Sequence, residues 1–248
     1  METININNDS ELVLDTQSKD IQININKCRV IVTDISACKK NIIVNDGYLD
    51  YCFVKRDNSD TSTNVSVYNG EAKMNIIDIA NNDSSNEYTL TLENENSNVD
   101  ISIASVSKNN SQKKYKVNSK NMIGYTSSKI DCFGIVEDTS LLKYDITSFI
   151  KNGAKKSIVN QNSKILLFDK QSIGINNPIL EIEENDVKAN HGSSIGMIDE
   201  ETLFYLTSRG IKDEDARKLV SFGKINYIID AIKDEKIKNE LLKEMMEV

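Results

Sequence analysis

The sequence predicts a mainly β protein with a small C-terminal α-helical region. Short runs rich in β-branched and aromatic residues follow one another from about residue 21 to residue 182, and several alternate polar and apolar residues, as strands with one buried face do. Apolar residues at helical spacing are missing from this stretch. The pattern changes after residue 196, where capping residues and glycines bracket segments with helical periodicity.

The β-prone runs are separated by clusters of Asn, Asp, Ser and Gly, residues that favour turns and tolerate left-handed backbone. After an N-terminal segment of residues 1–20, the β core is expected to span residues 21–196. Examples of its expected strands are residues 21–25, 30–35, 41–46, 51–55, 65–68, 74–80, 88–93, 99–106, 164–169 and 179–183. This pattern alone leaves a sandwich, a barrel and a solenoid open. A solenoid with coils of roughly 20–25 residues would have about seven of them.

The C-terminal helical region is expected to span residues 197–248. Asp199 is a good N-cap for a helix with an acidic first turn, and Gly210 is expected to end that helix in the left-handed conformation. Asp213 is expected to cap a second helix that ends at Gly223, and a third helix follows into the charged end of the chain.

The charge and hydropathy of the chain exclude some classes of function. It has 38 acidic and 30 basic residues, a net charge of −8, which opposes non-specific binding to nucleic acid. No apolar run is long enough to span a membrane, and the N-terminus lacks the basic start and apolar stretch of a signal peptide. A cytoplasmic location is therefore expected.

His191 is the only histidine, and histidine is well suited to bind a transition metal near neutral pH. A lone histidine is more often a hydrogen-bonded structural residue, and a metal site here would need further ligands from carboxylates, cysteines or a second polypeptide. The cysteines lack CxxC spacing, so each is expected to be a small buried residue, although thiolates are the usual iron–sulfur ligands. They are Cys28, Cys38, Cys52 and Cys132.

Seven sequence blocks occur in one order near the C-terminus. They are KILLFD (164–169), PILEI (178–182), DVK (186–188), HGSSIG (191–196), DEE (199–201), LFYLTSRGI (203–211) and AR (216–217). In these blocks the chain resembles the SufB/SufD family, the scaffold subunits of the SUF iron–sulfur cluster assembly system, in a compact, SufD-like form. The likeness is clear from about residue 134 to residue 230 and faint before. It implies a right-handed parallel β-helix core followed by α-helices.

The resemblance also implies a non-enzymatic scaffold that holds a transient iron–sulfur cluster at a subunit interface. His191 falls on the histidine that SufD-like subunits place at that interface as a cluster ligand. The positions of the usual family cysteines hold Asn162 and Ala189, and Gly192 stands where SufB-type chains have a glutamate. Cys132 is then the best internal candidate for a thiol ligand, with a partner subunit as the other source.

The partners that the resemblance implies are a SufC-type ABC ATPase and a second SufB/SufD-type scaffold, in a homodimer or a heterodimer. The residues expected to contact a partner are Leu203, Phe204, Tyr205, Arg209, Gly210 and Arg217. The chain has no GxxxxGK[ST] loop and is not expected to hydrolyse ATP. Two other readings stay open: a β-helix enzyme that acts on acidic polysaccharide, and a purely structural β-solenoid.

Overall fold

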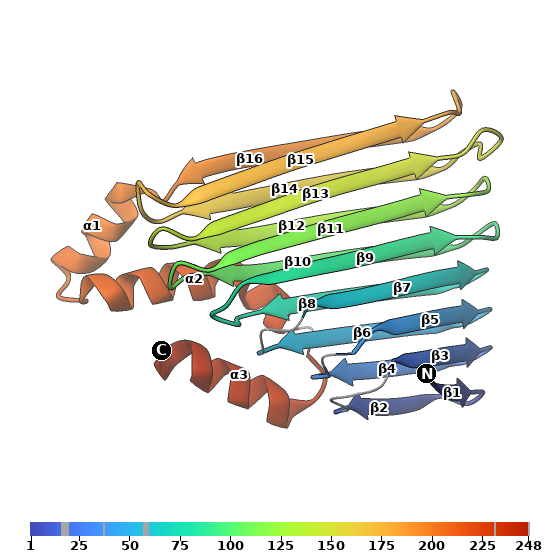
Figure 1. Cartoon of the computed structure of the whole chain (residues 1–248), viewed down its shortest axis with the longest axis horizontal. Helices are drawn as coiled ribbons and strands as arrows, with labels where there is room; N and C mark the ends of the chain where they lie inside the picture. The colour runs from blue at the N-terminus through green and yellow to red at the C-terminus, as the bar shows by residue number, and fades with distance from the viewer. Residues whose placement is uncertain (16–19, 37, 57–59, 231, 248) are drawn as a thin grey trace.

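The computed structural model describes residues 1–15, 20–36, 38–56, 60–230 and 232–247, and it consists mainly of two parallel sheets (Figure 1). Sheet A contains β1 (Glu2–Ile6), β3 (Ile21–Asn26), β5 (Lys40–Asn45), β7 (Thr61–Tyr68), β9 (Ser84–Leu92), β11 (Gln112–Asn121), β13 (Leu141–Ile150) and β15 (Ile173–Ile182). Sheet B contains β2 (Ser10–Leu14), β4 (Arg29–Asp34), β6 (Tyr48–Lys55), β8 (Glu71–Asp78), β10 (Asn98–Ser107), β12 (Ser127–Val136), β14 (Ile158–Leu167) and β16 (Lys188–Met197).

Consecutive strands alternate between the two sheets, so each pair of strands forms one coil of a solenoid like a parallel β-helix. The prediction of a mainly β fold with a β-helix core is confirmed, and this architecture decides between the solenoid, the sandwich and the barrel. The strands begin earlier than predicted. Residues 1–20 contain β1 and β2, which pair with β3 and β4 as the first coil, so this stretch belongs to the β body.

The coils widen from the N-terminal to the C-terminal end (Figure 1). The register pairs Glu2 with Ile21, 19 residues further on, and Leu141 with Ile173, 32 residues further on. The strands lengthen in step, from 5 residues in β1 to 10 in β16. The described residues form eight coils of this rising length, where the sequence suggested about seven coils of roughly 20–25 residues.

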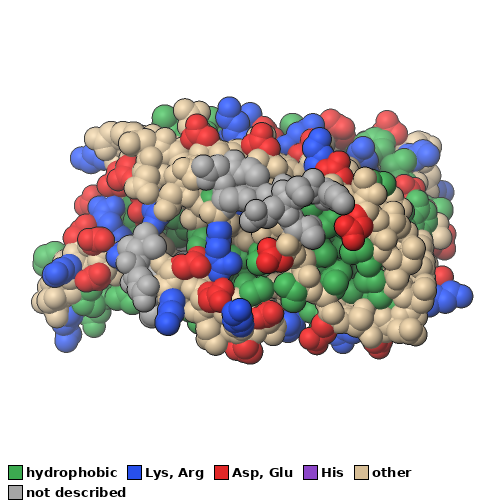
Figure 2. All heavy atoms as spheres, turned by 60° about the horizontal axis from the view of Figure 1, so that its bottom comes forward, with side chains coloured by type: hydrophobic (Ala, Val, Ile, Leu, Met, Phe, Trp, Pro, Cys, Tyr) green, Lys and Arg blue, Asp and Glu red, His purple; other side chains and the backbone are tan. Residues whose placement is uncertain are grey.

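Side chains from alternate positions of each strand fill the space between the sheets, as in-register parallel strands require. In β13 the inward residues Leu142, Tyr144 and Ile146 are fully buried. The four cysteines are free and buried, which confirms the reading of each as a small buried residue. Figure 2 brings the β1–β2 end forward and shows hydrophobic side chains on that face, where Val13 is 52% exposed.

The turns between strands use left-handed backbone at Asn and Asp, as the sequence pattern predicted. Non-glycine residues with positive φ at these turns include Asp46, Asn69, Asn96, Asn109 and Asp138. Short polar side chains lower the cost of this conformation, so such residues suit tight corners between two sheets.

Charged groups are also buried between the sheets, in two clusters in the N-terminal half. In the first, the Lys40 ammonium lies 3.0 Å from the carboxylate of Asp34, which also accepts a hydrogen bond from the Tyr51 hydroxyl. In the second, the Lys113 ammonium lies 2.6 Å from the carboxylate of Asp78. The four charged side chains of these two ion pairs are fully inaccessible to solvent.

Three helices follow the last strand: α1 (Glu200–Ser208), α2 (Asp213–Ile229) and α3 (Glu235–Glu247). The predicted N-cap Asp199 accepts hydrogen bonds from two backbone N–H groups of α1, and Gly210 follows this helix with φ +87°, as predicted. The predicted end of the second helix at Gly223 is wrong. Helix α2 passes through Gly223, because Ile225, Ile228 and Ile229 are buried against the solenoid and carry the helix past this glycine.

Helices α2 and α3 cover part of the outer face of sheet B. Their apolar residues pack against outward side chains near the carboxyl ends of the even-numbered strands, including Val54, Ile77, Ala104, Phe133 and Ile135. Helix α1 extends beyond the strands at the wide end of the solenoid (Figure 1). Among the described helices, none combines the length and the apolar character needed to cross a membrane.

Candidate functional site: the exposed terminal coil

The last coil, formed by β15 and β16, lies at the open, wide end of the solenoid (Figure 1). Within the described chain, β15 pairs only with β13 and β16 pairs only with β14, so each strand leaves one side of its backbone unpaired. A row of unpaired N–H and C=O groups on a ten-residue edge can pair with another chain. The edge residue Pro178 lacks an N–H group, which strands tolerate at an edge.

His191 lies on the inward face of this last coil. The register stacks it on Gln161 of β14, which stacks on Ile130 of β12, and both of these residues point into the core and are buried. Because in-register parallel strands place paired residues on the same face, the His191 side chain has the same orientation. It is nevertheless exposed, since no further coil covers it. The sequence-predicted ligand therefore lies at an open end of the solenoid.

The inward face of the last coil is also apolar around His191. Ile195 and Met197 follow it at alternate positions of β16, and they are 43% and 48% exposed. On β15 the inward residue Ile182 is 41% exposed. Our sequence analysis missed this surface, although period-two alternation from His191 through residues 193, 195 and 197 would have identified it. Exposed inward residues of this kind are typical of a surface that another body covers.

A polar layer lies directly below His191. The Gln161 amide nitrogen donates hydrogen bonds to the Ser148 hydroxyl (2.7 Å) and to the backbone oxygen of Ile179 (2.9 Å). Its amide oxygen is buried and has no hydrogen-bond partner among the described residues. The Ser163 hydroxyl, in the next inward row, donates to the Asn176 side-chain oxygen at 2.7 Å. The floor of the site therefore offers an unused acceptor below an exposed imidazole.

Cys132, the other predicted cluster ligand, lies away from this surface. Its strand β12 pairs with β14, and β14 separates it from β16. The distance from β12 to β16 across these two strand spacings is about 10 Å. The thiol is 3% exposed, and burial together with the charge of Asp131 raises its pKa well above the usual range, which disfavours the thiolate that ligates metal. The structure does not bring Cys132 and His191 together.

The donor set around His191 is incomplete for a metal or a cluster. Within the described residues, no group of three or more His, Cys, Asp or Glu side chains is placed to hold a metal ion. Ala189 and Asn162, at the positions of the family cysteines, cannot supply a thiolate. The described residues therefore do not fit a metal or cluster site held by this chain alone.

Helix α1 carries the most exposed of the predicted partner-binding residues. Phe204 is 73% exposed and Tyr205 is 58% exposed. The Arg209 guanidinium lies over the Tyr205 ring, 5.2 Å from its centroid, a cation–π contact that holds both side chains at the surface. Large apolar side chains this exposed on a short helix are characteristic of protein-binding surfaces.

The other predicted partner-binding residues make contacts within the chain. Leu203 packs against the apolar cluster below the helices, and Gly210 forms the left-handed end of α1. Arg217 bonds the backbone oxygen of Phe168 and the carboxylate of Asp169, each at 3.2 Å, so it fastens α2 to the end of β14. These three residues hold the helices in place. The large exposed side chains that remain from the predicted set are Phe204 and Tyr205 of α1 and Arg209 at its C-cap, and these three are called the exposed surface of α1 below.

Residues 6–224 match the model of the family described as SUF system FeS cluster assembly, SufBD core domain. The chain belongs to this SufBD family. The match includes nearly the whole solenoid and reaches far beyond the seven blocks near the C-terminus, so the faint N-terminal half belongs to the family domain as well.

Curated relatives within the SufBD family include SufD proteins. The chain is 35% identical to the iron–sulfur cluster assembly protein SufD of Bacillus subtilis over 109 residues, which are 44% of this chain and 25% of the relative. It is 32% identical to SufD of Escherichia coli over 108 residues, 44% of this chain and 26% of the relative. A SufBD family protein of Mycobacterium leprae is 44% identical over 66 residues, 26% of this chain and 17% of that protein. The matched part spans about a quarter of the two SufD proteins.

Proposed function

We propose that this chain is a non-enzymatic scaffold for iron–sulfur cluster assembly, in which the terminal coil pairs with a second SufB/SufD-type scaffold. The observation that carries the proposal is the exposed inward face of β15 and β16, where His191 is surrounded by apolar residues and two unpaired strand edges. The family match supports this function over an enzyme that acts on polysaccharide.

The terminal coil supports pairing through two kinds of contact. The unpaired backbone of β15 and β16 offers hydrogen bonds to strands of a partner, and the exposed residues Ile182, Ile195 and Met197 offer apolar surface. A partner that covers this face would bury His191 at the seam between the two bodies. A second copy of this chain and a different scaffold subunit both fit this geometry.

The cluster is the cargo of this scaffold, and the proposed ligand from this chain is the His191 imidazole. Imidazole nitrogen is a recognised minority ligand of iron–sulfur clusters, which are otherwise held by thiolates. Because Cys132 lies buried about two strand spacings below, the proposal assigns the thiolate ligands to the partner chain. Burial of the site by the partner would also protect the cluster from solvent.

The exposed surface of α1 is the proposed docking site for a SufC-type ATPase. Aromatic and arginine side chains are enriched among the residues that dominate binding energy, and Phe204, Tyr205 and Arg209 provide both kinds on one helix. Since α1 directly follows β16, movement of a bound ATPase would be transmitted to the terminal coil.

Replacing Phe204 and Tyr205 together by Ala is expected to weaken ATPase binding by about 30-fold or more, because aromatic anchors typically contribute about 2 kcal/mol or more. Surface plasmon resonance with the purified ATPase measures this. Tyr125→Ala is the matched control, since Tyr125 is 59% exposed in the turn between β11 and β12, away from the helices. Equal binding by the double variant and the control would contradict the assignment of α1.

His191→Ala is expected to reduce the iron–sulfur cluster retained by the scaffold pair by about tenfold or more, because loss of a ligand or of its support has effects of this size. The measurement is anaerobic reconstitution with ferrous iron and sulfide, followed by visible absorbance and iron analysis. Lys188→Ala is the control, an exposed change on the outward face of the same strand. Full retention of cluster by His191→Ala would support the purely structural reading of this residue.

A further inference from the structure

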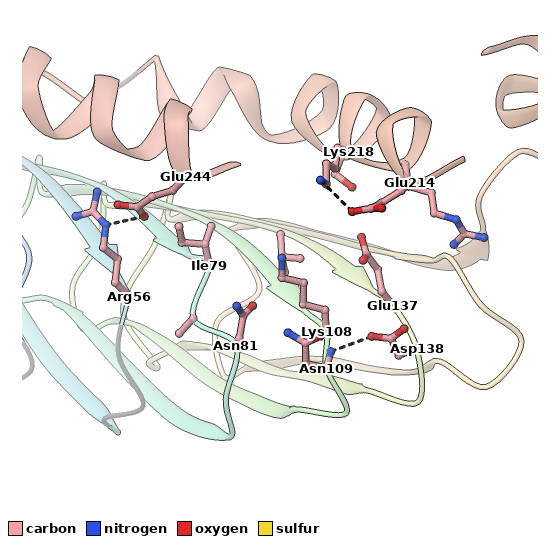
Figure 3. Close-up of a pocket in the computed structure, with 14 residues that line it drawn as sticks. Arg56, Ile79, Asn81, Lys108, Asn109, Glu137, Asp138, Glu214, Lys218 and Glu244 are labelled. Atoms are coloured by element: carbon pink, nitrogen blue, oxygen red, sulfur yellow. Dashed lines mark hydrogen bonds and ion pairs between the residues drawn. The ribbon is translucent and has the colours of Figure 1, made fainter. Parts of the chain in front are cut away.

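A cavity of about 480 Å³ lies between sheet B and the C-terminal helices, distant in the fold from the terminal coil (Figure 3). Residues at or just after the carboxyl ends of β6, β8, β10 and β12 form its floor, and α2 and α3 form its roof. Figure 3 shows the side chains from these two sides facing one another across the space.

Most charged groups around the cavity already have partners. Three of the cationic side chains form ion pairs. Arg56 pairs with Glu244 at 2.9 Å, Lys218 with Glu214 at 3.1 Å, and Arg217 with Asp213 at 2.8 Å. The Asp138 carboxylate accepts a hydrogen bond from the backbone N–H of Asn109 at 2.9 Å. These contacts stabilise the walls of the cavity. Within the described residues they leave one buried nitrogen of Arg56, Nη2, without a hydrogen-bond partner, and they leave two charged side chains without any hydrogen bond or ion pair.

The two charged side chains of the lining that lack such contacts are those of Lys108 and Glu137. Neither side chain makes a hydrogen bond or ion pair with the described residues, and both are half-buried. Burial lowers the pKa of the Lys108 ammonium and raises the pKa of the Glu137 carboxyl group, so in each case solvent stabilises the charged form less than usual. In Figure 3 both side chains extend from the strand side into the space below α2.

The rest of the lining supplies a hydroxyl group and an apolar wall. Ser221 of α2 is 7% exposed, and its hydroxyl is buried without a hydrogen-bond partner among the described residues. Ile79, Ala80 and Val106 contribute apolar surface. The cavity thus combines a cation and an anion that feel each other's charge but make no hydrogen bond or ion pair with the described residues, an unsatisfied hydroxyl and a hydrophobic side.

We propose that this cavity binds a free α-amino acid, with the ligand carboxylate on Lys108, the ligand ammonium on Glu137 and the ligand side chain against the apolar wall. A simple anion would meet repulsion from Glu137, and a simple cation would meet repulsion from Lys108. A zwitterion satisfies both groups and adds no net charge to the half-buried site. The inference is independent of the scaffold proposal, since it concerns other residues and another face.

Such a ligand would connect the turns of sheet B with the roof helices. Lys108 and Glu137 belong to the solenoid, whereas Ser221 belongs to α2. A molecule that contacts all three would therefore favour the docked position of α2, and its binding would raise the midpoint of thermal unfolding.

The test is isothermal titration of the full chain with each of the common amino acids, and with propionate and propylamine as probes that carry only one of the two charges. At least one amino acid is expected to bind with a Kd of about 1 mM or tighter, and both single-charge probes are expected to bind about tenfold more weakly or worse. Absence of binding by every amino acid would overturn the inference, as would propionate or propylamine binding as tightly as the best amino acid.

Two variants locate the binding in this cavity. Lys108→Met and Glu137→Gln are each expected to weaken binding of the best amino acid by about tenfold or more, since each removes a charge-assisted contact. Lys120→Met and Glu95→Gln, which change exposed residues outside the cavity, are expected to leave it unchanged. Unchanged binding by both cavity variants would overturn the assignment. Circular dichroism verifies folding, and the comparison of probes on the unmodified chain remains decisive if a variant unfolds.

Discussion

Asp78→Asn is expected to lower the free energy of unfolding by about 3–5 kcal/mol, the usual cost of removing one partner from a buried ion pair. The Asp78 carboxylate lies 2.6 Å from the Lys113 ammonium and 4.0 Å from the Lys55 ammonium, and all three side chains are buried between the sheets. It also accepts a hydrogen bond from the Tyr115 hydroxyl. The amide keeps the shape of the side chain and removes its charge, so the buried Lys113 ammonium loses the carboxylate that lies 2.6 Å from it.

Urea denaturation followed by circular dichroism measures this loss of stability. Glu87→Gln is the matched control, because it makes the same chemical change in the exposed pair of Glu87 with Lys116, where the side chains are 47% and 62% exposed. Pairs of this kind contribute about 1 kcal/mol or less. A cost below about 1 kcal/mol for Asp78→Asn would show that the buried lysines find other compensation in the folded chain.

Ile195→Glu is expected to raise the dissociation constant of the scaffold pair by about 100-fold or more. In the proposed pairing Ile195 is covered by the partner, and a buried carboxylate without a counter-ion costs several kcal/mol. In the free chain the same residue is 43% exposed, so the folded protomer should tolerate the change.

Analytical ultracentrifugation over a range of concentrations measures the pairing, with the chain alone and with the second scaffold. Ile179→Glu is the matched control: Ile179 is 45% exposed in the same coil, but its register partner Thr147 places it on the outward face of sheet A. The control should pair normally. If the two variants paired equally well, the inward face of the terminal coil would not be the interface.

The sequence predicted some strands and missed others, among them β11, β12 and β13. Strand β11 was missed because its inward positions include Lys113, Ser119 and Asn121, which interrupt the alternation of polar and apolar residues. In the same way, β16 was seen as a motif and not as a strand, because its inward face is not covered by another coil and need not be apolar throughout. Alternation of polar and apolar residues indicates a strand only when its inward positions are apolar. In β11 and β16 several inward positions are polar.

The candidate sites differ in how far the sequence could predict them. His191 was identified from its residue type and its block, but its place at an open end depends on the number of coils, which no local pattern reveals. The cavity near Lys108 could not be predicted at all. It depends on α2 continuing past Gly223 and lying across the turns of sheet B, an outcome decided by tertiary burial of the isoleucines beyond that glycine.

The steady widening of the solenoid means that its coils are not interchangeable. A coil of 19 residues at one end and a step of 32 at the other cannot exchange places, because strands of unequal length would then face each other across the ladder. The gradient in length therefore distinguishes the narrow end of the stack from the wide end, and gain or loss of a coil during evolution would be tolerated most readily at the two ends.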